Sequence, residues 1–271
     1  MTSSIDEAER SDARPAQINP LVVVTLNTWK GDGEYSARLR SMSEEVRNVG
    51  PDILLLQECF TAPSIGLDTA ASLAAVSDYR VASWLGRSKV RTCEGIEATS
   101  TSGLAVLSRH PIVSSWAIDL PSDPRDGDRA ALFAEINHRD GVVLVVSLHL
   151  THLRDGDALR RQQFDCVVNE LRRTPASRVI VGGDFNATPD KGFMTADLPN
   201  GRLVDSRLLS GATPTSTLVR GDACIDHILM LAPAGRKKDV NGVSVTTAFD
   251  RPDPINGVLP SDHFGVRVTI A

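Results

Sequence analysis

Short apolar runs rich in Val, Ile and Leu recur from residue 21 to the end of the chain and are separated by polar segments. Several runs are continuously apolar, as in Leu21–Asn27 (LVVVTLN) and Val142–Leu148 (VVLVVSL). This pattern is typical of strands covered on both faces, so it predicts sheets buried between other layers. The predicted strands are 21–27, 53–57, 103–108, 130–136, 142–148, 179–182, 224–230, 243–248 and 264–270.

Helical periodicity is restricted to a few segments. Apolar residues recur at steps of three and four in Tyr35–Val49 and in Asp155–Arg173, and a shorter helix is predicted at Leu67–Val76. Long loops are predicted at 87–102, 119–129 and 189–217, either as functional segments or as tolerated insertions. No repeat or linker divides the sequence, so we predict one α/β domain over residues 21–271.

The first twenty residues are polar and mixed in charge, which predicts a disordered N-terminal tail over residues 1–20. They contain no apolar core of a signal peptide, and no stretch reaches the ~18 apolar residues of a membrane-spanning helix. We therefore expect a cytoplasmic protein without a transmembrane segment. The four cysteines are widely separated and are expected to be buried thiols, with two disulfides as the alternative for a secreted chain.

Charge and aromatic content narrow the classes of function. The net charge is −5 over 271 residues, which excludes a protein that binds polyanions through its overall charge alone. Aromatic residues make up only 4%, which disfavours a stacking platform for single-stranded nucleic acid. Local phosphate binding through a metal ion or a few arginines remains compatible with this composition.

Polar side chains interrupt or follow the apolar runs at the ends of predicted strands. Each alone has an ordinary explanation, such as a cap, a turn or a buried structural histidine. Together they supply oxygen ligands for a hard divalent cation and groups for acid–base chemistry. These candidates are Asn27, Glu58, His149, Asp184, Asn186, Asp226, Asp262 and His263.

The order of these residues resembles that of the endonuclease/exonuclease/phosphatase superfamily, the deoxyribonuclease-I-like proteins. Within it, Leu26–Trp29, Ser102–Ile112 and Pro260–Gly265 are most similar to the neutral sphingomyelinase branch. The resemblance implies a four-layer α/β/β/α sandwich in which two mixed β-sheets pack face to face with helices outside. The matching motifs are Leu26-Asn27, Leu56-Gln57-Glu58, Gly103 to Pro111, Ser147 to Leu150, Gly183 to Asn186, Ile225 to Ile228 and Ser261-Asp262-His263.

The resemblance also implies a metal site. Glu58 is expected to bind Mg²⁺, or Mn²⁺ in its place, with Asn27 and Asp262 nearby. Mg²⁺ prefers oxygen ligands and bridges to substrate phosphate, so few protein carboxylates are needed.

The remaining matched positions imply acid–base roles. Asp184 is expected to orient or deprotonate the attacking water, and Asn186 to donate to a phosphoryl oxygen. His263 is expected to contact the phosphate or transfer a proton, with Asp226 orienting its ring. His149 is expected to stabilise the phosphate or assist the leaving group.

Several residues stay open at this point. Glu94 or Glu97 is a candidate carboxylate partner for His149. Arg129, at the start of a predicted strand, is expected to be a surface arginine, with a substrate contact as the alternative. His152 and His227 are expected to have no catalytic role.

The expected function is a Mg²⁺- or Mn²⁺-dependent hydrolase of phosphate esters, most plausibly a nuclease-type phosphodiesterase. The alternatives are a sphingomyelinase-like or other lipid or small-molecule phosphodiesterase or phosphatase, and, more remotely, a non-catalytic binding module on the same fold. The basic stretch Gly86–Arg91 suits a phosphate backbone, whereas the acidic loop 119–129 would repel one. The expected partner is a phosphate-ester substrate such as nucleic acid, and no protein partner is predicted.

Overall fold

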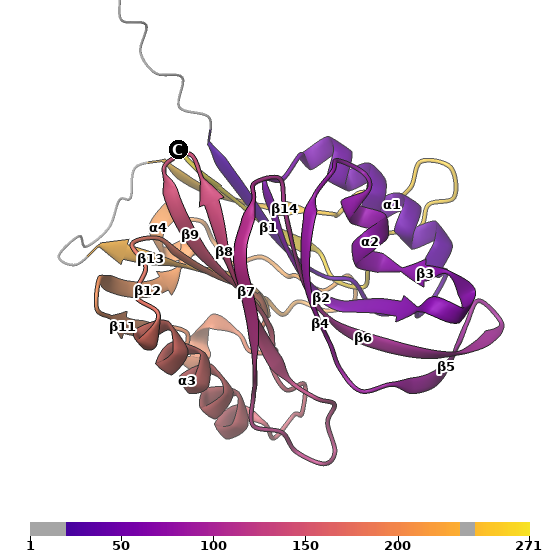
Figure 1. Cartoon of the computed structure of the whole chain (residues 1–271), viewed down its shortest axis with the longest axis horizontal. Helices are drawn as coiled ribbons and strands as arrows, with labels where there is room; N and C mark the ends of the chain where they lie inside the picture. Colours follow the sequence, from indigo (N-terminus) through magenta and orange to yellow (C-terminus); the bar gives the residue numbers. More distant parts are fainter. Residues whose placement is uncertain (1–19, 234–241) are drawn as a thin grey trace, which may run out of the picture.

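The computed structural model describes residues 20–233 and 242–271. The strands within these residues form two mixed sheets that pack face to face, as predicted (Figure 1). The tail predicted over residues 1–20 lies, apart from Pro20, outside the described residues.

The first sheet contains the N-terminal and C-terminal strands of the described chain. The central strand β1 is parallel to β2 and antiparallel to β15. In spatial order the sheet runs β14 (Val243–Ala248), β15 (Gly265–Ile270), β1 (Leu21–Asn27), β2 (Ile53–Ala62), β6 (Ile96–Ser108) and β4 (Arg80–Leu85), with β3 (Leu67–Asp68) paired to β2 and β5 (Lys89–Cys93) to β6.

The second sheet is built from the middle of the chain. Its strands β9 and β10 are parallel, and β13 runs antiparallel to β10. In spatial order it runs β11 (Ala196–Leu198), β12 (Gly201–Asp205), β13 (Asp226–Pro233), β10 (Val179–Asp184), β9 (Gly141–His149), β8 (Ala130–His138) and β7 (Ile112–Asp119).

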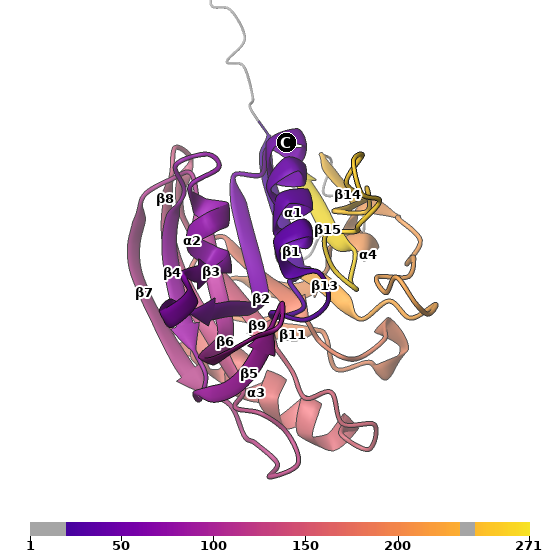
Figure 2. The same ribbon diagram turned by 90° about the vertical axis from the view of Figure 1, so that its right-hand side faces the viewer.

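Helices cover the outer faces of both sheets. Helix α1 (Tyr35–Val49) connects the parallel strands β1 and β2, and α3 (Asp157–Arg173) connects β9 and β10. The helix α2 (Thr69–Ala74) packs beside α1 on the first sheet, and α3 lies on the opposite side of the molecule (Figure 1 and Figure 2). The shorter helices are α4 (Ser206–Ser210), η1 (Pro63–Ile65) and η2 (Pro189–Lys191).

Three apolar layers hold these elements together. Side chains from the inner faces of the two sheets, such as Val23, Leu55 and Ile228, form the central core. The other two layers lie between the first sheet and α1–α2 and between the second sheet and α3. Because each sheet is covered on both faces, its strands are continuously apolar, and the predicted four-layer α/β/β/α sandwich is confirmed.

The structure has strands or helices in two of the three segments predicted to be loops, so those two predictions are wrong. Residues 87–102 contain β5 and the first half of β6, and residues 189–217 contain η2, β11, β12 and α4. These strands are short or polar and partly exposed, so they lack the apolar runs on which the prediction depended. The loop predicted at 119–129 is confirmed, because β7 ends at Asp119 and β8 begins at Ala130.

Three of the four cysteines are buried thiols, as predicted. All four cysteines are free thiols; Cys59, Cys93 and Cys224 are buried and Cys166 is half-buried. Among the described helices, none is long and apolar enough to cross a membrane. The cytoplasmic location stays a prediction.

Candidate active site

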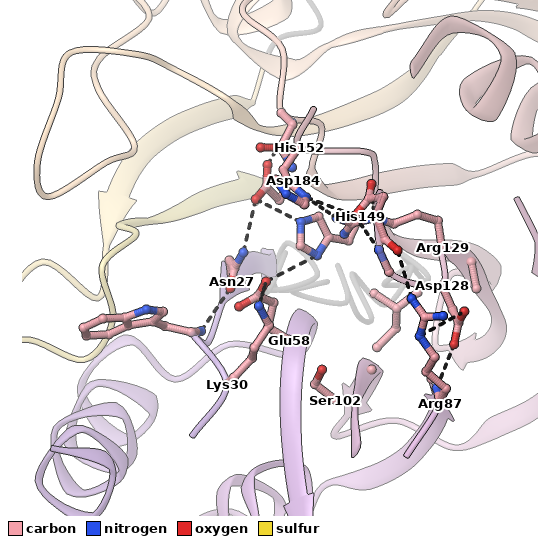
Figure 3. Close-up of a pocket in the computed structure, with 18 of the residues that line it drawn as sticks. Asn27, Lys30, Glu58, Arg87, Ser102, Asp128, Arg129, His149, His152 and Asp184 are labelled. Carbon is pink, nitrogen blue, oxygen red and sulfur yellow. Dashed lines mark hydrogen bonds and ion pairs between the residues drawn. The ribbon is translucent and has the colours of Figure 1, made fainter. Parts of the chain in front are cut away.

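A cleft of about 600 Å³ opens where strands β1, β9 and β10 end (Figure 3). The first sheet contributes Asn27 and Glu58 to its lining, and the second sheet contributes His149 and Asp184. The cleft therefore lies across the seam between the two sheets, and each sheet supplies one wall.

The second sheet places three candidate residues side by side through its strand register. His149, the last residue of β9, is the register partner of Asp184, the last residue of β10. Asp184 is in turn the register partner of Asp226, the first residue of β13. Neighbouring strands are separated by ~4.8 Å, so these three side chains form one short row.

The first sheet reaches the same cleft through a β-bulge. The pairing of β2 with β6 shifts between Leu56 and Cys59, and Glu58 has a left-handed backbone with φ of 55°. The sequence predicted that the strand ends at Gln57-Glu58, whereas β2 continues to Ala62. A bulge re-aims a side chain without ending its strand, which explains how Glu58 lines the cleft within a longer strand.

The segment before β15 is held against the end of β1. The hydroxyl of Ser261 donates a hydrogen bond of 2.6 Å to the carbonyl oxygen of Asn27. Asp262 and His263 follow directly and both line the cleft. Residues separated by more than 230 positions are thereby brought to one edge of the sheet.

Asp184 is the centre of the resulting side-chain network. Its Oδ2 accepts a hydrogen bond of 3.1 Å from Nδ2 of Asn27, and its Oδ1 accepts one of 2.8 Å from the backbone N–H of Asn186. The Nε2 atoms of His149 and His263 lie 3.5 Å and 4.0 Å from the same Oδ2. These contacts orient the carboxylate toward the cleft.

Burial and neighbouring charges shift the pKa values of the site residues in different directions. Burial, together with the nearby Asp226, raises the pKa of Asp184 to about 7. Burial by itself would lower the pKa of His263, but the charges of Asp226, Asp184 and Asp262 outweigh it and raise that pKa to about 10. His263 is therefore a cation at neutral pH, while Asp184 can take up or release a proton there.

The second histidine has the opposite character. Burial first, and then the nearby positive charge of Arg129, lower the pKa of His149 well below its usual value. Arg129 is itself fixed by Asp126, which accepts bonds of 2.7 and 3.1 Å from its Nη2 and Nε atoms. The Arg129 side chain is only 9% exposed, so the expected surface arginine is wrong, and its contact with substrate stays a prediction.

The residues predicted to bind metal fit a hard divalent cation. Glu58, Asn27 and Asp262 offer carboxylate and amide oxygens, the ligands that Mg²⁺ and Mn²⁺ prefer. Strand β1 lies between β2 and β15, so Glu58 and Asp262 flank Asn27 at the same edge. All three line the polar cleft.

A second group, made of Asp184, Asp226 and His263, has possible ligand atoms within 4.8 Å of one another. Oδ1 of Asp226 is buried and has no hydrogen-bond partner among the described residues. However, Nδ1 of His263 lies 2.9 Å from Oδ2 of Asp226, and a protonated imidazole is not a metal ligand. The oxygen ligands of Glu58, Asn27 and Asp262 therefore suit a divalent cation better than this second group does.

Comparison with known proteins identifies the family to which the chain belongs. The sequence profile of the Endonuclease/Exonuclease/phosphatase family matches residues 24–263. The chain belongs to this family. The family comprises hydrolases of phosphate ester bonds, and its members typically use divalent metals.

Solved structures agree with this assignment at the level of the fold. TDP2 from Caenorhabditis elegans superimposes with a TM-score of 0.70 at 19% identity, covering 93% of this chain and 74% of that one. D. rerio TDP2 in complex with single-strand DNA product gives 0.68 at 18% identity, with 93% and 99% covered. The catalytic domain of human Nocturnin with bound sulfate gives 0.67 at 20% identity, with 93% and 94% covered. A search of curated protein sequences gives no match.

All eight residues selected from the sequence of this endonuclease/exonuclease/phosphatase family member lie in or directly behind one cleft. Seven of them line it. Asp226 is fully buried and reaches the cleft through its contact with His263. The side-chain N–H₂ of Asn186 donates to the carbonyl oxygen of Leu150, which leaves one of its two hydrogens for another acceptor.

Neither glutamate considered as a partner of His149 lies beside it. The carboxylate of Glu94 accepts bonds of 2.7 Å from the backbone N–H and the hydroxyl of Ser36. Glu97 is exposed on β6 and does not line the cleft. The carboxylates within 4.0 Å of His149 in the described chain are Asp184 and Glu58.

The two histidines expected to be structural are placed differently in this family member. His227 is fully buried behind the site, where its ring nitrogens contact Oδ2 of Asp205 at 2.8 Å and the carbonyl oxygen of Ala187 at 2.9 Å. His152 lines the cleft, and its Nδ1 lies 2.9 Å from Nη2 of Arg129.

Sequence reasoning missed three residues that shape this cleft. Lys30 contacts Glu58, Asp126 fixes Arg129, and the buried Arg38 binds backbone carbonyl oxygens around the cleft. Asp126 belongs to a loop interpreted through its net charge, which hides a buried carboxylate. Nothing in the spacing around Lys30 or Arg38 indicated their contacts, because both depend on the conformation of one turn.

Proposed function

We propose that this protein is a divalent-metal-dependent phosphodiesterase of the nuclease type. The observation that carries the proposal is the position of Asp184, which is contacted by Asn27, His149 and His263 in the cleft that Glu58 also lines. Carboxylates and imidazoles with widely separated pKa values in one cleft suit acid–base catalysis.

Asp184 is the candidate base for the attacking water. Asn27 and the backbone of Asn186 hold its two oxygens by hydrogen bonds. A pKa raised to about 7 by burial and by Asp226 matches the range in which general bases are most effective. In this proposal a water next to Asp184 gives a proton to the carboxylate as its oxygen attacks phosphorus. The bond from phosphorus to the leaving oxygen breaks, and the departing alkoxide takes up a proton from solvent water.

The two histidines act on the phosphoryl group in different ways. His263, held as a cation by Asp226, donates a charged hydrogen bond to a phosphoryl oxygen. His149 is neutral because of its burial, so it forms a hydrogen bond to the phosphoryl group as a neutral imidazole and carries no extra proton to donate. Arg129, fixed by Asp126 next to His149, adds a positive charge on the same wall.

Glu58, Asn27 and Asp262 would hold the divalent cation. When bound, such a cation polarises a phosphoryl oxygen and offsets the negative charge that develops in the transition state. The residues that would hold the cation adjoin the acid–base group, because Nδ2 of Asn27 lies 3.1 Å from Oδ2 of Asp184 and Oε1 of Glu58 lies 4.0 Å from Nδ1 of His149.

Two features support a nucleic acid as the phosphodiester. D. rerio TDP2, which shares the fold, was solved with single-strand DNA product. In the present chain the cleft is lined by Lys89 and Arg91 from the β5–β6 hairpin and by Trp84 from β4. Cationic and aromatic side chains in one groove are suited to a sugar–phosphate strand and its bases.

The direct test is hydrolysis of bis-p-nitrophenyl phosphate with Mg²⁺ or Mn²⁺, with and without EDTA. We expect EDTA to abolish hydrolysis, and Asp184→Ala and His263→Ala each to reduce it by roughly 10²- to 10⁴-fold. Asp222→Ala, an exposed carboxylate outside the cleft, serves as the matched control. Full activity in either site variant would contradict the assigned roles.

A substrate panel then decides the class. It contains single-stranded DNA, plasmid DNA, RNA, sphingomyelin, phosphoinositides and nucleotide esters. We expect the nucleic acids to be cleaved fastest. Turnover of lipid alone would replace the nuclease assignment by a lipid phosphodiesterase. If no phosphate ester is hydrolysed, the proposal that the protein is a phosphodiesterase is wrong.

A further inference from the structure

We propose that Lys30 is an exchangeable counter-cation of the cleft, which pairs with Glu58 in the absence of a divalent cation and with a substrate phosphate oxygen in its presence. The inference rests on the proposed function, because it assigns a further phosphate-binding group to the same site. It concerns a residue that neither the sequence motifs nor the acid–base network includes.

The contact between Lys30 and Glu58 is direct. The Nζ atom of Lys30 lies 3.1 Å from Oε1 of Glu58, and the two side chains are 34% and 14% exposed (Figure 3). Among the described residues, the other basic group within 4.0 Å of this carboxylate is the ring of His149, at 4.0 Å. The ammonium of Lys30 is therefore the basic group nearest to the Glu58 carboxylate in this part of the chain.

The backbone beneath Lys30 is held in an uncommon conformation. Trp29 and Lys30 are consecutive non-glycine residues with φ of 55° and 43°, in the left-handed region that side chains disfavour. Two such residues in succession persist only where their surroundings determine them, and outliers of this kind cluster at functional sites. The conformation therefore indicates that the surrounding structure fixes the position of the Lys30 backbone.

Arg38 supplies much of that constraint. Its guanidinium is buried and donates to the carbonyl oxygens of Thr28, Trp29, Lys30, Asp32 and Pro260. The backbone N–H of Trp29 also donates to Oδ1 of Asn27, at 3.0 Å. The turn is thus tied to Asn27 on one side and to the segment preceding Asp262 on the other.

This arrangement fixes the Cα atom of Lys30 at the rim of the metal-binding residues and leaves its side chain as the movable part. A lysine ammonium is a point charge on a flexible four-carbon stem, so it can change partners without a change in the backbone. Lys30 lines the same cleft as Asp184, Asn186 and His263, where the phosphate is expected to bind.

Two thermodynamic consequences follow. A divalent cation that binds Glu58 must displace the ammonium of Lys30, so Lys30 weakens metal binding in the absence of substrate. A phosphate that receives the displaced ammonium removes this cost, so phosphate and metal each increase the affinity for the other. Such coupling is reciprocal by linkage.

The test measures Mn²⁺ binding by electron paramagnetic resonance of the free ion, using the full chain with and without inorganic phosphate. We expect Lys30→Gln to bind Mn²⁺ alone about fivefold more tightly than the native chain, as for the loss of one partly exposed ion pair. We also expect phosphate to increase the Mn²⁺ affinity of the native chain by a larger factor than that of Lys30→Gln.

Two further variants make the test specific. Lys30→Arg keeps a cation at this position and should bind Mn²⁺ like the native chain. Lys191→Gln removes a lysine that lies 2.9 Å from a carboxylate oxygen of Asp157 outside the cleft, and should leave Mn²⁺ binding unchanged. Thermal denaturation of every variant confirms that each remains folded.

Equal or weaker Mn²⁺ binding by Lys30→Gln, or an unchanged phosphate effect, would overturn the proposal. So would Lys30→Arg binding Mn²⁺ as tightly as Lys30→Gln. A native chain that binds Mn²⁺ but hydrolyses no phosphate ester would contradict the proposed function alone. A native chain that binds no Mn²⁺ would contradict both.

Discussion

The Nδ1 atom of His263 lies 2.9 Å from Oδ2 of Asp226, and this pair joins the two sheets of the sandwich. Asp226 begins β13 of the second sheet, whereas His263 precedes β15 of the first. The opposite ring nitrogen faces Asp184 at 4.0 Å. The pair thus sets both the direction and the charge of the imidazole that the proposed mechanism uses.

Asp226→Asn should lower the pKa of His263. Burial by itself lowers that pKa, and the charges of Asp226, Asp184 and Asp262 raise it to about 10, so removing one charge shifts it downward. Nuclear magnetic resonance of the imidazole protons between pH 6 and 10.5 measures the shift. We expect a decrease of at least about one pH unit, together with slower hydrolysis of bis-p-nitrophenyl phosphate.

Asp140→Asn is the matched control for this titration. Asp140 lies 3.3 Å from Nδ1 of His138, at the turn between β8 and β9, and is exposed. The Asp140→Asn substitution should alter the titration of His138 and leave the titration of His263 unchanged. An unchanged His263 pKa in Asp226→Asn would show that Asp226 does not hold the proton there.

His149 should make the fold less stable in acid. Its folded-state pKa is lowered, first by burial and then by Arg129, so below pH ~6.5 the unfolded chain binds a proton at this residue that the folded chain does not. Stability is therefore lost as the pH falls below that value. Urea unfolding at pH 5 to 7 should give a flatter pH dependence for His149→Gln, by up to about 1.4 kcal/mol per pH unit. Identical slopes would contradict a buried neutral imidazole.

Glu58→Gln should weaken metal binding. The amide retains one oxygen ligand but loses the negative charge, so we expect the Mn²⁺ concentration for half-maximal activity to rise at least about tenfold. Glu97→Gln changes an exposed residue of β6 that does not line the cleft, and should leave this Mn²⁺ concentration unchanged. A metal requirement that is the same in Glu58→Gln and the native chain would assign the cation to other residues.

Gly183→Ala should destabilise the strand that carries Asp184. A Cβ atom at Gly183 would lie 2.0 Å from the carbonyl oxygen of Leu148 on the neighbouring strand β9. Since backbone must move to relieve this contact, we expect a loss of about 2–4 kcal/mol in the free energy of unfolding, measured in urea. At Gly127 a Cβ atom meets nothing within 4 Å, so Gly127→Ala should change stability by less than about 0.5 kcal/mol.

The sequence predicted the core strands and the longer helices well because their apolar periodicity directly reflects burial. Helix α1 has the predicted bounds, and its end follows from Gly50, which adopts a left-handed φ of 58° and donates its N–H to the carbonyl oxygen of Val46. Strands β4, β5 and β7 were not predicted. They lie at sheet edges with alternating or polar surfaces, where burial leaves a weak signal.

The site residues were selected in the sequence by their order, but their contacts were not predictable from it. The hydrogen bond from Asn27 to Asp184 joins residues 157 positions apart in different sheets. The role of Asp126 as the partner of Arg129 was equally hidden, because a charged loop shows net charge and not which carboxylate is buried. The positive φ angles at Lys30 and Glu58 occur in residue types that rarely adopt them, so the sequence did not indicate them.

The sequence by itself determined the buried strands, the connecting helices and the set of chemical groups available at the strand ends, since these depend on local burial and residue type, whereas the two-sheet arrangement was expected only from the family resemblance. The tertiary structure decided which groups meet. Strand register aligned His149, Asp184 and Asp226, a bulge turned Glu58 into the cleft, and a buried Arg38 fixed the turn that places Lys30 beside it. These relations depend on long-range packing and backbone conformation, which adjacent residues do not encode.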